Sequence, residues 1–271
     1  MKKYIALLLA LMMVFALCAC GSSGKGGDTL VMATNAAFPP YEFVEGDQFA
    51  GIDVTVAALI ADKLGMTLEV SDMEFNSIIP AVQSGKASMG MAGMTVTEDR
   101  LKNVNFSASY ATGVQVVIVP EGSDITSIDD MYAKLDEGYD LQIGCQDATT
   151  GYIYASDTVD NGGFGEDHVQ AFPKGADAVA ALLSGKIDCV IIDNEPAKAF
   201  VSANEGLKIL DSDYVTEDYA IAVAKDNEEL LEKVDTALQE LIADGTVEAV
   251  VNYYISGEGE LPATNQTFTV G

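Results

Sequence analysis

Hydrophobic residues recur along the chain in two alternating patterns, one typical of strands and one typical of helices. Apolar residues at positions 52, 56, 59, 60 and 64 share one helical face, which predicts a helix over 53–64 that ends at Gly65. Short apolar or β-branched runs predict strands at 30–34, 67–70, 88–92, 114–119, 141–144, 169–172, 189–192 and 220–224. Further helices are expected at 77–84, 151–158, 177–184 and 227–244. This alternation indicates an α/β fold with mostly parallel sheets.

One short motif occurs in each half of this pattern. Ser84-Gly85-Lys86 closes a predicted helix and opens a strand, and Ser184-Gly185-Lys186 does the same later in the chain. The shared tripeptide in a shared context predicts two similar lobes. Ligands of open α/β sheets bind beyond the carboxyl ends of the strands. We therefore expect binding residues at 93–95 in one lobe and 193–194 in the other.

The N-terminus has the pattern of a targeting segment. Two lysines precede an apolar run over residues 5–17, which is short for a membrane span. The run ends in Leu17-Cys18-Ala19-Cys20, which resembles a bacterial lipobox, with cleavage after residue 19 and lipid on Cys20. Ordinary signal-peptidase cleavage and a retained anchor are the alternatives. Residues 20–28 are rich in glycine and serine and predict a flexible tether, which places the globule outside the cytoplasmic membrane.

Composition excludes several classes of function. The formal net charge is −28, which argues against nucleic-acid binding because a phosphate backbone requires a basic surface. Beyond the targeting segment, Cys145 and Cys189 lie in apolar runs and are expected to be free core thiols. No Cys/His grouping has metal-ligand spacing, so we expect neither a metal site nor a cofactor. His168 is the only histidine, and no catalytic motif surrounds it.

The best candidate constellation is a site for a zwitterion, which requires a cation for its carboxylate and an anion for its ammonium. Arg100 is the only arginine and follows a strand end; it can bind a carboxylate bidentately or pair with its neighbours Glu98 and Asp99. Asp193 ends an apolar strand and can receive an ammonium or cap the next helix. The sequence leaves both alternatives open.

Other residues in the same regions complete the candidate site. The sequence Thr149-Thr150-Gly151 opens a helix, where free N–H groups favour an anion and where threonine also acts as a simple N-cap. Phe38 and Phe75 lie in loops beside strand ends. Such aromatic rings serve either as core residues or as walls that sandwich a ligand side chain.

At these residues the chain resembles the extracellular solute-binding proteins of polar amino-acid ABC importers (family 3). The resemblance is carried by residues 34–43, 51–65, 75–110, 144–151 and 187–200, and above all by the run from Ile78 through Gly93-Met94-Thr95 to Arg100. It extends over about residues 30–254. It implies a two-lobed periplasmic-binding-protein-like fold of type II, in which each lobe is a mostly parallel sheet flanked by helices. Hinge crossovers near 111–115 and 218–222 would separate lobe 1 (29–112 and 222–271) from lobe 2 (113–221).

The resemblance also implies a role for each candidate residue. Arg100 would hold the ligand carboxylate, assisted by Thr95 and Thr150, while Asp193 and the Gly93 carbonyl would take the ammonium. Phe38 and Phe75 would flank the side chain. Asn35 stands where binders of basic amino acids often carry an acid, and Ala92 and Gly93 replace hydroxyl residues of some members.

The implied function is capture of an amino acid for an ABC permease by a monomeric, lipid-anchored receptor without chemistry on the ligand. An enzyme on the same scaffold and a sensor of occupancy are the alternatives. A buried cationic side chain of the ligand would require a carboxylate beside it. Asn35 carries no charge, and the sequence gives no geometry for Glu42 or Asp147, the two acids that could supply one. Uncharged polar amino acids therefore rank first, basic ones second and acidic ones last.

Overall fold

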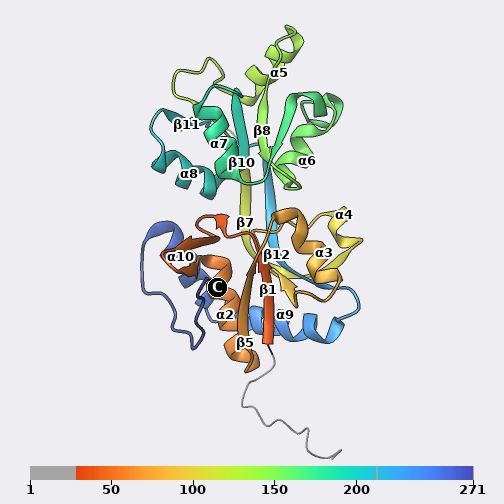
Figure 1. The fold of residues 1–271 in the computed structure, drawn as a ribbon, viewed down its shortest axis with the longest axis vertical. Helices are drawn as coiled ribbons and strands as arrows, with labels where there is room; N and C mark the ends of the chain where they lie inside the picture. Colours follow the sequence, from red (N-terminus) through yellow and green to blue (C-terminus); the bar gives the residue numbers. More distant parts are fainter. Residues whose placement is uncertain (1–28, 212, 271) are drawn as a thin grey trace, which may run out of the picture.

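The computed structural model describes residues 29–211 and 213–270, so the predicted signal peptide and the whole predicted tether, with Cys20, lie outside the described residues. The chain folds into two α/β lobes placed end to end along the long axis (Figure 1). Two long strands, β7 (Val104–Pro120) and β12 (Val215–Ala224), run side by side from one lobe into the other. They pair antiparallel from Val215↔Gln115 to Ala224↔Val104. The α/β alternation predicted from the sequence is confirmed.

Lobe 1 contains the strand order β5-β1-β6 followed by β12 and β7, with β1 parallel to both β5 and β6. Its strands are β1 (Thr29–Thr34), β5 (Thr67–Asp72) and β6 (Met89–Gly90), with a small separate sheet of β2 (Ala37–Phe38), β3 (Glu42–Glu45) and β4 (Gln48–Ala50). Its helices are α2 (Ile52–Leu64), α3 (Ile78–Gln83), α4 (Glu98–Leu101), α9 (Glu228–Ala243) and α10 (Thr246–Ser256), with a 3-10 turn at Phe75–Ser77. Helix α2 is buried along most of its length, from Ile52 to Ala61.

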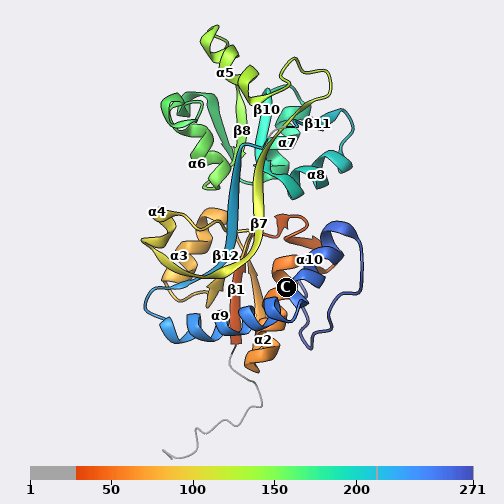
Figure 2. The same cartoon turned by 180° about the vertical axis from the view of Figure 1, so that it is seen from behind.

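Lobe 2 continues the sheet in the order β7-β10-β8-β9, and β11 pairs antiparallel with the C-terminal end of β7, at Ile118–Pro120. Its strands are β8 (Ile143–Gln146), β9 (Val169–Phe172), β10 (Cys189–Asp193) and β11 (Leu207–Ile209). Its helices are α5 (Ile128–Asp136), α6 (Thr150–Ser156), α7 (Gly175–Leu183) and α8 (Asn194–Ala203), with 3-10 turns at Val159–Asn161 and Glu166–His168. Seen from behind, β7 and β12 are the continuous strands between the lobes (Figure 2).

Several elements differ from the sequence prediction. Strand β7 spans 17 residues, whereas only 114–119 were expected, because its first half mixes serine, alanine and threonine and is fixed by pairing with β12. Strand β6 has only 2 residues instead of the predicted 88–92. The small sheet β2–β4, the helices α4, α5 and α10, and the strand β11 were not predicted. Five of them, β2, β3, β4, α4 and β11, have only 2–4 residues and are too short to show a periodic pattern.

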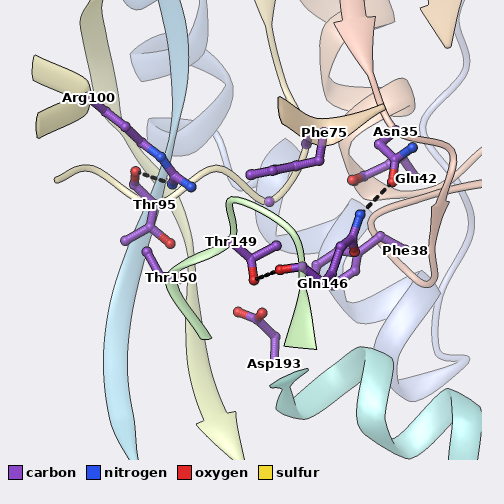
Figure 3. Close-up of a pocket in the computed structure, with 12 residues that line it drawn as sticks. Asn35, Phe38, Glu42, Phe75, Thr95, Arg100, Gln146, Thr149, Thr150 and Asp193 are labelled. Atoms are coloured by element: carbon purple, nitrogen blue, oxygen red, sulfur yellow. Dashed lines mark hydrogen bonds between the residues drawn. The ribbon is translucent and has the colours of Figure 1, made fainter. Parts of the chain in front are cut away.

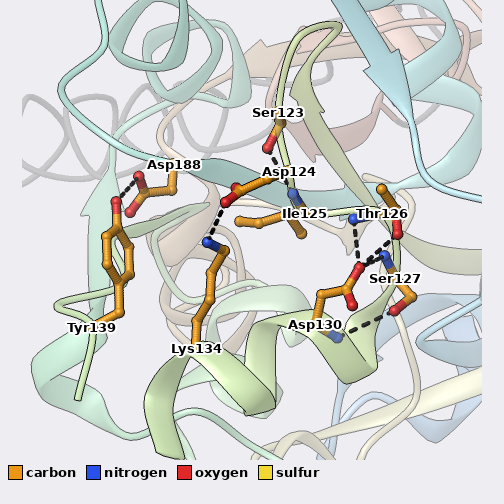
Figure 4. Close-up of polar contacts among 9 residues, drawn as sticks. All are labelled: Ser123, Asp124, Ile125, Thr126, Ser127, Asp130, Lys134, Tyr139 and Asp188. Carbon is orange, nitrogen blue, oxygen red and sulfur yellow. Dashed lines mark hydrogen bonds and ion pairs between the residues drawn. The ribbon is translucent and has the colours of Figure 1, made fainter. Parts of the chain in front are cut away.

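Helix α5 lies at the outer tip of lobe 2 (Figure 1), and local polar contacts surround it (Figure 4). Ser127 and Asp130 form a capping box at its start, and Lys134 pairs with Asp124 at 2.8 Å. Met131 is its only buried residue. Exposed ion pairs contribute less than about 1 kcal/mol, so the capping box and the packing of Met131 on the lobe 2 core position this helix more than the ion pair does.

The segment after α10 returns along lobe 1 and covers the free edge of the small sheet. The Asp62 carboxylate accepts hydrogen bonds from the Thr264 hydroxyl and from the Gln266 side-chain amide, each at 2.7 Å. The Phe49 N–H donates to the Phe268 carbonyl at 2.7 Å. These contacts support the hairpin of β3 and β4, and β3 carries Glu42.

The remaining sequence predictions on lobe 2 concern thiols and the single histidine. Cys145 and Cys189 are both free and buried, as predicted. The His168 ring lies 3.0 Å from the Leu141 carbonyl through Nδ1, in the body of lobe 2. Within residues 29–211 and 213–270, no helix is long and apolar enough to cross a membrane.

Candidate amino-acid site

A cavity between the two lobes brings together side chains from both (Figure 3). All eight predicted site residues line it: Asn35, Phe38, Phe75, Gly93, Thr95, Arg100, Thr150 and Asp193. Four further residues complete the lining: Glu42, Ala92, Gln146 and Thr149. In the figure, Arg100 and Thr95 lie at one end of the cavity, Asn35 and Glu42 at the other, and Phe75 between them.

Arg100 is a buried cation without an ion pair in the described part of the chain. It is 7% exposed on the short helix α4, and its guanidinium donates to the Thr95 carbonyl at 2.8 Å and to the Ala148 carbonyl at 3.1 Å. The alternative of a salt bridge with a sequence neighbour is not realised, since Asp99 pairs with Lys102 instead. The guanidinium also lies 5.3 Å from the centre of the Phe75 ring. A buried guanidinium bonded only to carbonyls retains its charge for an anionic ligand group.

Asp193 presents a buried carboxyl from lobe 2. It stands at the end of β10 and at the N-cap position of α8, but its side chain makes no capping hydrogen bond. Its carboxyl instead accepts a hydrogen bond from the Tyr219 hydroxyl. Burial, together with the negative charge of Glu217, raises the pKa of Asp193 to about 7. A cationic group beside this carboxyl would stabilise its ionised form.

The two threonines at the start of α6 make different contacts. Thr149 is the N-cap, and its hydroxyl accepts from the Tyr152 N–H at 3.4 Å. The Thr150 hydroxyl donates to Glu217 at 2.9 Å. Because Glu217 lies on β12, this bond ties the start of α6 to a crossover strand.

The walls of the cavity are formed by small and aromatic residues of lobe 1. Phe38 stacks on Tyr41 with ring centroids 6.0 Å apart. Gly93 has a φ of +51°, and a Cβ atom there would lie 3.0 Å from Phe38. A side chain at position 93 would therefore be strained and would press on the aromatic wall.

Polar contacts across the cavity hold the two lobes together. Gln146 of lobe 2 donates to the Asn35 side chain of lobe 1 at 2.9 Å, in a buried position. Nearer the surface, Asn76 donates to Asp147 at 2.8 Å. With the bond from Arg100 to Ala148, these contacts join the lobes around the cavity. Asp147, which the sequence offered as a pocket acid, is thus placed beside the cavity and not in its lining.

Buried charge in and around the cavity is strongly unbalanced. Four carboxyls are almost fully buried here against the one guanidinium: Glu42 at 1%, Asp53 at 0%, Asp193 at 6% and Glu217 at 5% exposure. Burial raises the pKa of Asp53 to about 7. Burial and the nearby charge of Asp53 hold the pKa of Glu42 well above its usual range. An environment of this kind favours ligands that carry positive charge.

Two lobes joined by a pair of crossover strands, with a charged cavity between them, define a solute receptor of the periplasmic-binding-protein type. The chain matches the family of bacterial extracellular solute-binding proteins, family 3, over residues 30–257 and belongs to it. Its members are solute-binding proteins and not enzymes, so the prediction that the chain is not an enzyme is confirmed.

Relatives with known names are amino-acid-binding proteins of ABC transporters. The arginine-binding extracellular protein ArtP of Bacillus subtilis is 33% identical over 265 residues, covering 95% of this chain and 100% of that protein. A putative ABC transporter arginine-binding protein 2 of Escherichia coli is 30% identical and covers 93% and 98% of the two chains. An ancestral arginine-binding protein bound to glutamine has a TM-score of 0.76 at 37% identity, covering 85% of this chain and 98% of its own.

Sequence reasoning missed Gln146 and left Glu42 undecided. Gln146 ends the parallel strand β8, as Asp193 ends β10. The rule that ligands bind at the carboxyl ends of strands would have indicated it. Glu42 lies on β3 of the small sheet, and its direction is set by the hairpin and by packing on α2, which no local pattern records.

Proposed function

We propose that this chain is a lipid-anchored receptor on the outer face of the cytoplasmic membrane. It holds one amino acid between its lobes and delivers it, as a monomer, to the permease subunits of an ABC importer. The supporting observation is that Arg100 of lobe 1 and Asp193 of lobe 2 line one cavity with opposite charges. The lobes divide near residues 112 and 222, within the crossover strands.

In this proposal the backbone of the ligand is held by complementary charges. Arg100 binds the carboxylate, with donors from Thr95 and Thr150, and Asp193 binds the ammonium with the Gly93 carbonyl. Because these groups come from both lobes, the ligand contacts the closed arrangement more fully than an open one. Its binding then favours closure, as differential contacts require.

The side chain of the ligand extends between Phe38 and Phe75 toward Glu42, Asn35 and Gln146. The sequence alone ranked uncharged polar amino acids above basic ones because Asn35 carries no charge. The position of Glu42 in the cavity lining supplies the missing acid and moves basic amino acids to the first rank. The names of the arginine-binding relatives support this order. Glutamine follows, because its amide matches the amides of Asn35 and Gln146.

Calorimetric titration with arginine, glutamine, cystine and glutamate tests the proposed function. We expect arginine to bind most tightly, glutamine next and glutamate least. Tightest binding of glutamate would refute the assignment of charges in the cavity. No binding by any free amino acid would refute the function itself.

A separate prediction concerns the anchor. If Cys20 receives lipid, Cys20→Ser is expected to release the protein into the medium or to leave it unprocessed. Cell fractionation and mass spectrometry of the N-terminus measure both outcomes, and Cys18→Ser serves as the matched control because it leaves the modified position intact. A cleaved Cys20→Ser protein that stays on the membrane would contradict the lipobox.

A further inference from the structure

Two buried carboxyls meet at the far end of the cavity from Arg100. Glu42 comes from β3 and lines the cavity, and Asp53 comes from the first turn of α2 behind it. The two side chains lie within hydrogen-bonding reach of each other. Each is almost fully buried, at 1% and 0% exposure.

The hydrogen bonds around this pair are incomplete in a way that points to a shared proton. One oxygen of Asp53 accepts from the Gly93 N–H at 2.8 Å and from the Tyr110 hydroxyl at 2.9 Å. Its other oxygen, Oδ1, and Oε2 of Glu42 are buried and accept no hydrogen bond from any donor in the described chain. Two ionised carboxylates in contact repel each other, whereas one proton between them supplies the missing donor.

The groups that surround Glu42 do not stabilise its ionised form. Besides Asp53 of α2, the charged groups facing it are Asp193 at the end of β10 and Asp72 at the end of β5. Tyr41 of the preceding loop and Tyr110 of β7 are neutral, and burial raises the pKa of both. Arg100, the one buried cation of the part of the chain that the structure describes, lies at the opposite end of the cavity (Figure 3).

We propose that Glu42 and Asp53 share one proton in the ligand-free protein and release it to solvent when a cationic side chain enters the cavity. The inference rests on the proposed function, because it requires that an amino acid binds with its side chain toward Glu42. The proton and the cationic side chain are then competitors for the same carboxyl pair. A neutral side chain of the same shape leaves the proton in place.

The direction of the pH effect follows from this competition. A guanidinium beside Glu42 lowers the pKa of the pair, so the proton leaves on binding and affinity rises with pH. One released proton corresponds to about tenfold in affinity per pH unit within the window. The Asp193 carboxyl also titrates, but it contributes equally for both ligands because it binds the ammonium group that every amino acid carries. Arginine and its neutral isostere citrulline therefore differ only at the Glu42–Asp53 pair.

The test is calorimetric titration of the full-length protein with arginine and with citrulline between about pH 5 and pH 9. Titration in buffers of different ionisation enthalpy counts the protons released. We expect arginine to release about one proton more than citrulline near neutral pH. The ratio of arginine to citrulline affinity should rise by up to about tenfold per pH unit. In Glu42→Gln, the difference in slope is expected to disappear.

The matched control is Glu45→Gln, the same chemical change on the exposed end of the same strand, which should keep the difference in slope. Equal proton release by the two ligands in the wild type would overturn this inference and leave the proposed function standing. Binding of neither arginine nor citrulline would also overturn this inference, whereas the proposed function falls only if no free amino acid binds. If Glu42→Gln does not fold, the wild-type proton count decides.

Discussion

Replacing Arg100 with alanine is expected to weaken binding of every amino acid by about 30-fold to several-thousand-fold. The variant leaves the ligand carboxylate buried without its cation, which typically costs about 2–5 kcal/mol. It also removes the hydrogen bond to the Ala148 carbonyl, one of the contacts between the lobes. Because the other partner of Arg100 is a carbonyl of its own loop, we expect the folded state to persist. Calorimetry measures the affinity, and circular dichroism verifies the fold.

The control for this variant is Lys102→Ala, which removes an exposed cation from the end of the same short helix. Its affinity should equal that of the wild type, since the long-range field of one exposed charge is largely screened. Unchanged affinity in Arg100→Ala would exclude the proposed carboxylate site. A loss of similar size in both variants would mean that net charge, not position, governs binding.

Replacing Asp193 with asparagine is expected to produce a second loss of similar size, about 2–5 kcal/mol. The substitution keeps the size of the side chain and its contact with Tyr219, but it removes the charge that receives the ammonium. Since the pKa of Asp193 lies at about 7, protons compete with the ligand ammonium in the wild type. Affinity for a neutral amino acid such as glutamine should therefore fall as the pH drops below about 7.

In Asp193→Asn this part of the pH dependence should vanish together with the affinity. Asp160→Asn, the same change at an exposed position of lobe 2, is the control and should leave both unchanged. Glutamine titrations over a range of pH compare the three proteins. A pH profile that persists in Asp193→Asn would assign the titration to another group.

The sequence predicted most elements of the fold because their patterns are local. Helix α2 has a regular apolar face and ends at Gly65, which adopts the left-handed conformation with a φ of +66°. Both features can be recognised from neighbouring residues of the sequence. The length of β7 was not predictable in the same way. Its first half acquires its strand conformation from β12, more than a hundred residues away in the chain.

In the candidate site, too, residues marked by local sequence patterns were predicted, whereas contacts between distant segments were not. Arg100, Asp193 and the aromatic residues were found because each follows a strand end or belongs to a motif of the family. Their chemical partners were not found. Nothing local indicates that Thr150 donates to Glu217, or that Asn35 accepts from Gln146, because both bonds join distant segments. The same applies to Glu42 and Asp53, which meet only through the packing of the β3 hairpin on α2.

The central claim is that one amino acid is held by both lobes at once. Small-angle scattering of the protein with and without saturating arginine measures this most directly. We expect the radius of gyration to fall when arginine binds, because the ligand joins Arg100 of lobe 1 to Asp193 of lobe 2 and draws the lobes together. A radius of gyration that stays the same at full saturation would contradict binding between the lobes.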